Sequence, residues 1–136
     1  MRISTKGRYA LRVIIDLAQH SKEGYISIKT ISERQEVSMK YLEAIVASLH
    51  KAGLVQSQRG KEGGYMLTKP ADEYTVGAII RATEGSISPV SCLDPDEAAC
   101  ERAEACITLP MWQKLDDLVN NFLDNTTIAD LINGKV

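Results

Sequence analysis

The sequence predicts a mainly α-helical fold with a small β wing, in the order of a winged helix-turn-helix followed by a long C-terminal helix. Two observations predict this class. Three segments with apolar residues at helical spacing precede a glycine-rich hairpin at residues 54–70, and a wide apolar stripe follows Pro110. The chain has 136 residues, of which 44% are hydrophobic, so it is long enough for one domain with an appendage.

Apolar residues that recur every three or four positions predict the first three helices. These helices are expected at residues 7–20, from residue 27 or 28 to residue 35, and from Ser38 to Ala52. Each follows a side chain that can accept hydrogen bonds from the first helical turn. The expected N-caps are Ser4 or Thr5, Ser27 and Ser38. Gly24 and Gly53 are expected to end the first and third helices.

The wing is predicted by two short alternating segments around a glycine-rich turn. Residues 54–58, LVQSQ, and residues 65–67, YML, are the expected strands, and Pro70 ends the hairpin. A fourth helix is expected at TVGAIIRAT, residues 75–83. After that helix, residues 85–106 contain two prolines and no periodicity, so we expect a loop that something else must organise.

The segment after Pro110 is expected to form a long amphipathic helix, followed by a short helix capped by Asn125 or Thr126. Because its apolar face is too large for an isolated helix, we expect this helix to pack against its own copy in a two-fold dimer. That face contains Leu115, Leu118, Val119 and Phe122. The predicted parts are a winged helix-turn-helix DNA-binding domain at 1–84, a cysteine-containing sensor loop at 85–107, and a dimerisation helix with a short terminal helix at 108–136.

Charge is distributed unequally along the chain. Residues 1–69 hold 12 basic and 6 acidic side chains, whereas residues 70–136 hold 4 basic and 12 acidic ones, although the net charge is only −2. This asymmetry favours a polyanion partner for the first half, and the alternative is two ordinary solvated surfaces. No apolar run approaches the roughly 18 residues of a membrane span, and the charged N-terminus does not resemble a signal peptide. We therefore expect a cytoplasmic protein with no membrane partner.

Candidate DNA contacts fall in three places: the start of the third helix, the hairpin tip and the start of the first helix. These positions can reach base edges, groove floors and phosphates respectively. The candidates are Ser38, Lys40, Tyr41 and Glu43; Arg59, Gly60 and Lys61; and Arg2, Thr5 and Lys6. Glu43 can accept from cytosine N4, or it can be an ordinary surface charge. Arg59 can enter a minor groove, and Lys61 can contact a phosphate.

All three cysteines of the chain, Cys92, Cys100 and Cys106, lie in one acidic stretch, SCLDPDEAACERAEAC. Clustered thiols without paired CxxC spacing favour an iron–sulfur cluster over a structural zinc site. A fourth ligand has to come from a partner subunit or from the acidic residues of the loop. Those residues are Asp94, Asp96, Glu97, Glu101 and Glu104.

Alternatives to a metal site remain open for these cysteines. The three residues can act as small, half-buried hydrophobic side chains, or as a redox switch through a Cys100–Cys106 or Cys92–Cys100 disulfide. No acid–base pair or nucleophile–base arrangement indicates an enzyme. A protein of a different class, a small metal-binding or electron-transfer protein, is the further alternative.

Three segments resemble one known family: MRISTKGRYALRVIIDLA, SMKYLEAIVASLHKAGLVQSQRGKEGGYML and TVGAIIRATEGSISPV. They are similar to the Rrf-two family of bacterial transcription regulators, the group that includes IscR, NsrR and CymR. The resemblance covers nearly the whole chain. It implies a winged helix-turn-helix homodimer on a palindromic DNA operator, and a repressor of iron–sulfur cluster assembly genes.

The resemblance also implies a cofactor. IscR-like members hold a 2Fe–2S cluster, rather than a 4Fe–4S cluster, through three cysteines and a histidine, and Cys92, Cys100 and Cys106 fall on the cysteine positions. The histidine position is occupied by Leu109, and the first two cysteines are separated by seven residues instead of five. NsrR-like members use an aspartate where this chain has Arg8. CymR-like members lack the cysteine triplet, so a cluster-free repressor of cysteine metabolism with a partner enzyme is the alternative within the family.

Overall fold

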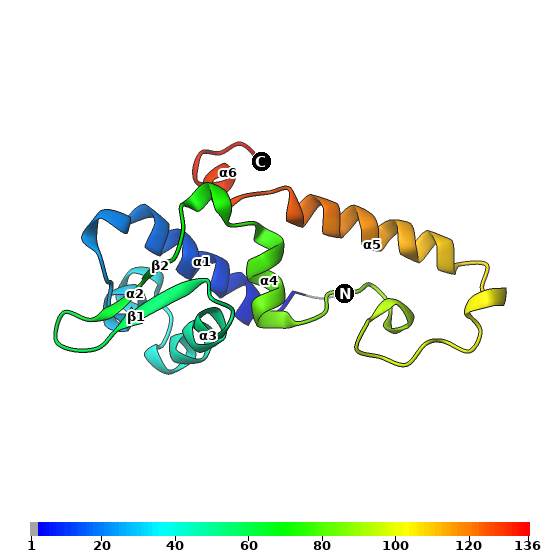
Figure 1. Cartoon of the computed structure of the whole chain (residues 1–136), viewed down its shortest axis with the longest axis horizontal. Coiled ribbons are helices and arrows are strands. Elements are labelled where there is room, and N and C mark those ends of the chain that lie inside the picture. Colours follow the sequence, from blue (N-terminus) through cyan, green and yellow to red (C-terminus); the bar gives the residue numbers. More distant parts are fainter. Residues whose placement is uncertain (1–2) are drawn as a thin grey trace.

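The computed structural model describes residues 3–136, which form six α-helices and one two-stranded antiparallel sheet (Figure 1). The elements are α1 (Thr5–Gln19), α2 (Ile28–Gln35), α3 (Met39–Lys51), β1 (Val55–Gln58), β2 (Gly64–Leu67), α4 (Val76–Glu84), α5 (Leu109–Asp124) and α6 (Ile128–Ile132). Four short 3₁₀ turns interrupt the loops, at Ser21–Glu23, Ala71–Glu73, Ser91–Leu93 and Ala103–Ala105. This order confirms the predicted fold class, a mostly helical winged helix-turn-helix with a long C-terminal helix.

Two of the four predicted N-caps are confirmed, those of α2 and α3. Ser27 Oγ accepts from the Thr30 N–H at 3.1 Å, and Ser38 Oγ accepts from the Tyr41 N–H at 3.2 Å. The predicted cap of the last helix is wrong, because Thr127 forms a capping box there with Asp130.

Neither residue expected to cap α6 is free for that role. The Thr126 hydroxyl donates to the Phe122 carbonyl at 2.7 Å, and Asn125 ends α5. Ser4 precedes α1 as expected, but its side chain makes no capping bond to that helix.

The wing lies close against the segment that precedes α2. Strand β1 pairs with β2 from Val55↔Leu67 to Gln58↔Gly64, and the backbone of Ile26 adds two hydrogen bonds to Tyr65. Gly64 has φ +153°, and a Cβ there would lie 2.2 Å from the Ile26 carbonyl oxygen. Glycine is therefore required where the wing meets this segment.

The hydrophobic core lies between α1, α3, α4 and the wing. Ile14, Leu42 and Tyr74 are completely buried in it, and the Tyr74 hydroxyl donates to the Leu54 carbonyl at 2.5 Å. Ile128 of α6 belongs to the same core, and its N–H donates to the Tyr74 carbonyl at 2.9 Å. We call residues 4–84 together with α6 the body. The three predicted parts stay a prediction, with the addition that the short terminal helix packs in the body.

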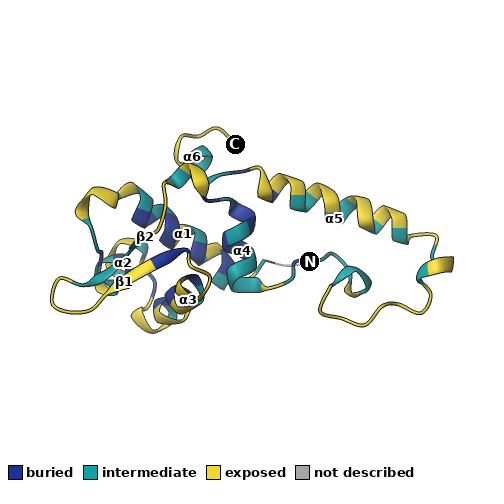
Figure 2. Ribbon diagram, in the orientation of Figure 1, coloured by how far each residue is buried: buried dark blue, intermediate teal, exposed yellow. Residues whose placement is uncertain are grey.

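We call residues 85–124, the cysteine loop and α5, the arm. In Figure 1 the loop runs outward beneath α5, and the chain then returns toward the body as α5 itself. Figure 2 shows that most of α5 is exposed. A small second core of Val76, Ile80, Ile87 and Leu123 joins the arm to α4. Across the part of the chain that the structure describes, no helix has the length and hydrophobicity to span a membrane.

Candidate nucleic-acid interface and cysteine loop

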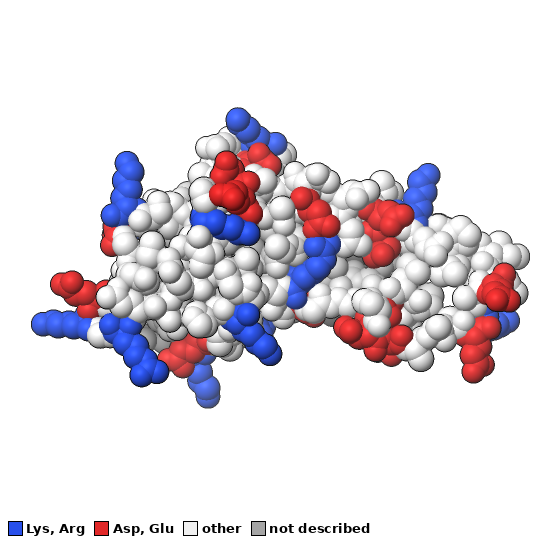
Figure 3. Space-filling model, viewed as in Figure 1, with Lys and Arg blue, Asp and Glu red and all other residues white. Residues whose placement is uncertain are grey.

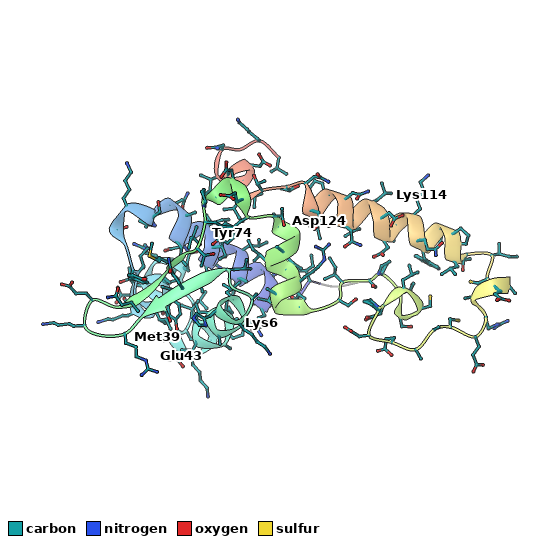
Figure 4. The ribbon with its side chains drawn as sticks, in the orientation of Figure 1. Lys6, Met39, Glu43, Tyr74, Lys114 and Asp124 are labelled. Atoms are coloured by element: carbon teal, nitrogen blue, oxygen red, sulfur yellow. The ribbon has the colours of Figure 1, made fainter. Side chains whose placement is uncertain are left out.

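Helix α3 presents one polar face at its N-terminus and one apolar face to the core. Leu42, Ile45, Val46 and Leu49 are at most 1% exposed, whereas Met39, Lys40 and Glu43 are exposed. Figure 4 shows Met39 and Glu43 together at the lower margin of the body. The structure therefore leaves the predicted base-reading face of α3 accessible, which is what a helix entering a major groove needs.

The tip of the wing carries further exposed basic side chains. Arg59, Gly60 and Lys61 are all exposed, and Gly60 has φ +109° in the turn between the strands. In Figure 3 Lys and Arg side chains project from the wing end and the lower margin of the body, while acidic side chains are spread along the arm. The charge asymmetry of the sequence thus becomes a difference between the two regions of the fold.

The N-terminus of α1, where the sequence predicts a phosphate contact, is occupied by a carboxylate of the protein itself. Glu84, the last residue of α4, accepts from the Ser4 N–H at 2.7 Å and from the Gly7 N–H at 3.1 Å. Its carboxylate therefore occupies the helix N-terminus where the sequence suggests a phosphate. Lys6 Nζ donates to Ser48 Oγ at 3.0 Å. Thr5 and Lys6 remain predicted DNA contacts, and Arg2 lies outside the described residues.

Glu84 was not identified from the sequence as a functional residue. It lies 77 positions after Gly7, and the periodicity of a single helix carries no information about such a distant partner. The sequence feature that could have indicated this contact is Gly7, a small residue in the first turn of α1. A Cβ on Gly7 would lie 2.4 Å from Glu84 Oε1, so the close approach of this carboxylate depends on glycine.

The cysteine loop contains three free thiols. Cys92 and Cys106 are half-buried, and Cys100 is exposed. Cys100 and Cys106 line one surface hollow together with Arg102, Ala105, Ile107 and Thr108. The structure thus brings two of the three predicted ligands to one place.

The described residues, 3–136, do not gather three or more His, Cys, Asp or Glu side chains at one point. Among the candidate fourth ligands, Asp94 accepts from the Asp96 N–H at 2.9 Å. Glu97, Glu101 and Glu104 are exposed on the loop. A four-ligand site at this loop therefore needs the loop to rearrange or a second subunit to contribute.

The surroundings of Cys106 favour its thiolate form. Its Sγ lies 3.4 Å from Thr108 Oγ1, and hydrogen bonds from the Thr108 hydroxyl and backbone lower the pKa of Cys106, with a smaller contribution from the charge of Arg102. Since the thiolate is both the metal ligand and the nucleophile, this position suits either chemistry.

A winged helix-turn-helix with an accessible polar face on its recognition helix defines a DNA-binding transcription regulator. The chain belongs to the Rrf2, or Rrf-two, family, described as iron-dependent transcriptional regulators, whose sequence pattern matches residues 3–134. It is 42% identical over 135 residues to the HTH-type transcriptional regulator IscR of Erwinia tasmaniensis. This match covers 99% of this chain and 81% of that protein.

Two solved structures are also similar over most of their length. CymR, the global cysteine regulator of B. subtilis, has a TM-score of 0.78 and 44% identity over 96% of this chain and 95% of its own. T. potens IscR has a TM-score of 0.74 and 38% identity, and the match covers 100% of this chain and 89% of that one. These matches confirm the family and the transcription-regulator function suggested by the sequence, and they agree with the expectation that the chain is not an enzyme.

Proposed function

We propose that this regulator is a cytoplasmic homodimer whose DNA binding depends on an iron–sulfur cluster, and that it represses genes for iron–sulfur cluster assembly. The observation that carries the proposal is the position of the thiols. All three lie in one loop between the DNA-binding body and α5, in a chain with IscR relatives at 42% identity. A ligand bound at this loop could therefore affect both the DNA-binding body and α5, because the loop joins them.

The donor set fits an iron–sulfur cluster in its chemistry. Cys92, Cys100 and Cys106 supply three soft thiolate ligands, and the lowered pKa of Cys106 favours its ligating form. Of residues 86–107 only Ile87 is buried, so few packing contacts oppose the rearrangement that ligation requires. We propose a 2Fe–2S cluster whose fourth ligand is an oxygen, because Leu109 cannot ligate.

Dimerisation is supported by the exposed apolar stripe on α5. Met111, Leu118 and Phe122 are 54%, 60% and 58% exposed, and with the half-buried Leu115 they follow a four–three–four spacing. That spacing is the seam of a two-stranded coiled coil. A second copy packed on this seam would place two α3 helices about 34 Å apart, as a palindromic operator requires.

A cluster-free thiol switch is the second candidate. Cys100 and Cys106 share one hollow, and the pKa of Cys106 is lowered, which favours oxidation of its thiolate by a peroxide to a sulfenic acid. The Cys100 thiol can then attack this sulfur and form the disulfide with release of water. The 44% identity to CymR, a cysteine regulator, supports this candidate. In that case a partner enzyme of cysteine metabolism would be a further partner.

The proposal is tested by anaerobic purification, with a visible spectrum and with iron and sulfide analysis. The protein should be coloured, and Cys92→Ala, Cys100→Ala or Cys106→Ala should each bleach it, because water replaces a thiolate ligand poorly. Ser91→Ala, an exposed change beside Cys92, is the matched control and should keep the colour. Colourless protein with three titratable thiols after reconstitution would reject the cluster and favour the thiol switch.

A further inference from the structure

One face of α1 holds the turn that joins the two helices of the helix-turn-helix. Arg12 Nε donates to Gln35 Oε1 at 3.1 Å, and Arg12 Nη2 donates to the Gln35 carbonyl. Asp16, one turn later and 1% exposed, accepts from Gln35 Nε2 at 3.0 Å and from Arg34 Nη2 at 2.7 Å. The last residue of α2 is therefore fixed from α1 through its side chain and its backbone.

The turn beyond Gln35 needs such support. Glu36 has φ +55° and ψ +45°, and it is the one non-glycine residue with positive φ among residues 3–136. Left-handed backbone is unfavourable for a residue with a Cβ and persists where its surroundings impose it. Ser38, two residues later, caps α3. The conformation at Glu36 therefore sets the direction in which α3 begins.

The same face of α1 also reaches the recognition helix itself. The Arg12 guanidinium lies 4.9 Å from the centre of the Tyr9 ring, and the Tyr9 ring meets the Tyr41 ring edge-on, with centroids 5.8 Å apart and planes at 86°. Tyr41 lies in the first turn of α3 and is half-buried, next to the exposed Lys40. Arg12, Tyr9 and Tyr41 thus form a continuous series of contacts from α1 to the polar face of α3.

We propose that Arg12 is a positioning residue for sequence reading, which orients α3 through the Gln35 turn and Tyr41 through Tyr9. This inference rests on α3 being the recognition helix and does not depend on the cluster. An exposed arginine in a DNA-binding body commonly neutralises a phosphate. Here its Nε and Nη2 donors are already directed at Gln35, in the planar fork geometry that lysine lacks.

The experiment compares two duplexes of equal length: one selected from random DNA by the unaltered protein, and a shuffled version of it. Arg12→Ala should lower the ratio of the two affinities about tenfold, the loss expected for one misplaced base contact. The slope of log affinity against log salt should stay the same. Arg12→Lys should behave like Arg12→Ala because it keeps the charge but not the fork.

Two further variants complete the test. Tyr9→Leu keeps an apolar side chain and removes the ring contact, so it should also lower the affinity ratio. Lys61→Ala, the matched loss of an exposed cation, should reduce the salt slope by about 0.9 per subunit, or about 1.8 for the proposed dimer, and leave the ratio unchanged. Thermal unfolding confirms that each variant is folded.

Two results would overturn the proposal. One is an unchanged affinity ratio in folded Arg12→Lys and Tyr9→Leu. The other is a reduced salt slope in Arg12→Ala that Arg12→Lys restores, which would make Arg12 a phosphate contact. Neither result bears on the colour or the iron content of the protein, so failure here is distinguishable from failure of the cluster proposal.

Discussion

The body and the arm of this chain are stabilised in different ways. The body encloses a core of fully buried side chains such as Ile14, Leu42 and Ile128. The arm leaves Leu118 60% exposed and Ile107 95% exposed, and its three thiols are free. One chain therefore buries the core of the DNA-binding body by itself, whereas under the proposed function a second copy and a bound ligand would complete the packing of the arm.

The connection between the two regions is narrow. Leu123 is the one buried residue of α5, and the Arg81 guanidinium donates to Asp124 at 2.5 Å and to Asn120 at 2.6 Å. Regions with few buried contacts are the least stable parts of a fold and the ones that binding can reorder at small cost. Because the connection between α4 and α5 is narrow, the arm can change its conformation without unfolding the body.

The largest expected effect is in the body. Tyr74→Ala should lower the free energy of unfolding by about 3–5 kcal/mol, because it leaves a cavity at a completely buried ring and removes the partner of the Leu54 carbonyl. Urea unfolding measures the loss. Ile107→Ala in the arm is the control and should change stability by less than about 0.5 kcal/mol. Equal losses in the two variants would remove the distinction between body and arm.

The next effect is on assembly. Leu118→Glu should weaken the dimer about 100-fold, because it places a charge in the proposed α5 seam. Sedimentation at micromolar concentration measures this, and circular dichroism should show an intact body. Gln113→Glu, an exposed position on the opposite side of α5, should leave the dimer unchanged. A stable dimer of Leu118→Glu would contradict the α5 seam.

A smaller effect is expected where α4 meets the start of α1. Glu84→Ala should cost about 1 kcal/mol of stability, the usual value of a helix N-cap, since its carboxylate accepts from the Ser4 and Gly7 N–H groups. Thermal unfolding checks this value. Glu97→Ala, in the exposed loop, should be neutral when both variants are compared in the metal-free state. If Glu84→Ala is also neutral, Glu84 does not stabilise α1.

The smallest effect concerns the chemistry of the arm. Hydrogen bonds from Thr108 lower the pKa of Cys106 from the ordinary value of a cysteine thiol, so alkylation of Cys106 should rise at lower pH than alkylation of a free thiol. Thr108→Val should move the half-point of that rise to higher pH. Mass spectrometry of metal-free protein at several pH values measures it. An identical half-point in both proteins would show that Thr108 does not act on this thiol.

Much of the body could be predicted from sequence because its signals are local. Ser27 and Ser38 lie one residue before the helices they cap, and the spacing of Ile45, Val46 and Leu49 identifies the buried face of α3. Thr127 was missed as a cap, because three polar residues in a row, at 125–127, give similar local signals.

Contacts between distant elements could not be predicted in the same way. The bond from Arg12 to Gln35 spans 23 positions, and the bond from Gly7 to Glu84 spans 77, whereas helical periodicity reports only on neighbours within a segment. For the candidate metal site, the sequence predicts the type of ligand but carries no information on the geometry. Cys92 lies outside the hollow that Cys100 and Cys106 share, because the loop has too few core contacts to gather the three thiols.

Amide hydrogen exchange on the coloured, anaerobically isolated dimer, before and after iron removal by a chelator, tests whether a bound cluster orders the arm. We expect slow exchange in α1, α3 and α4 in both states. In residues 86–107 we expect exchange about 100-fold faster after iron removal, because the loop then loses the ligand proposed to order it. Equal protection of residues 86–107 in both states would contradict the claim that the arm depends on a bound cluster for its order.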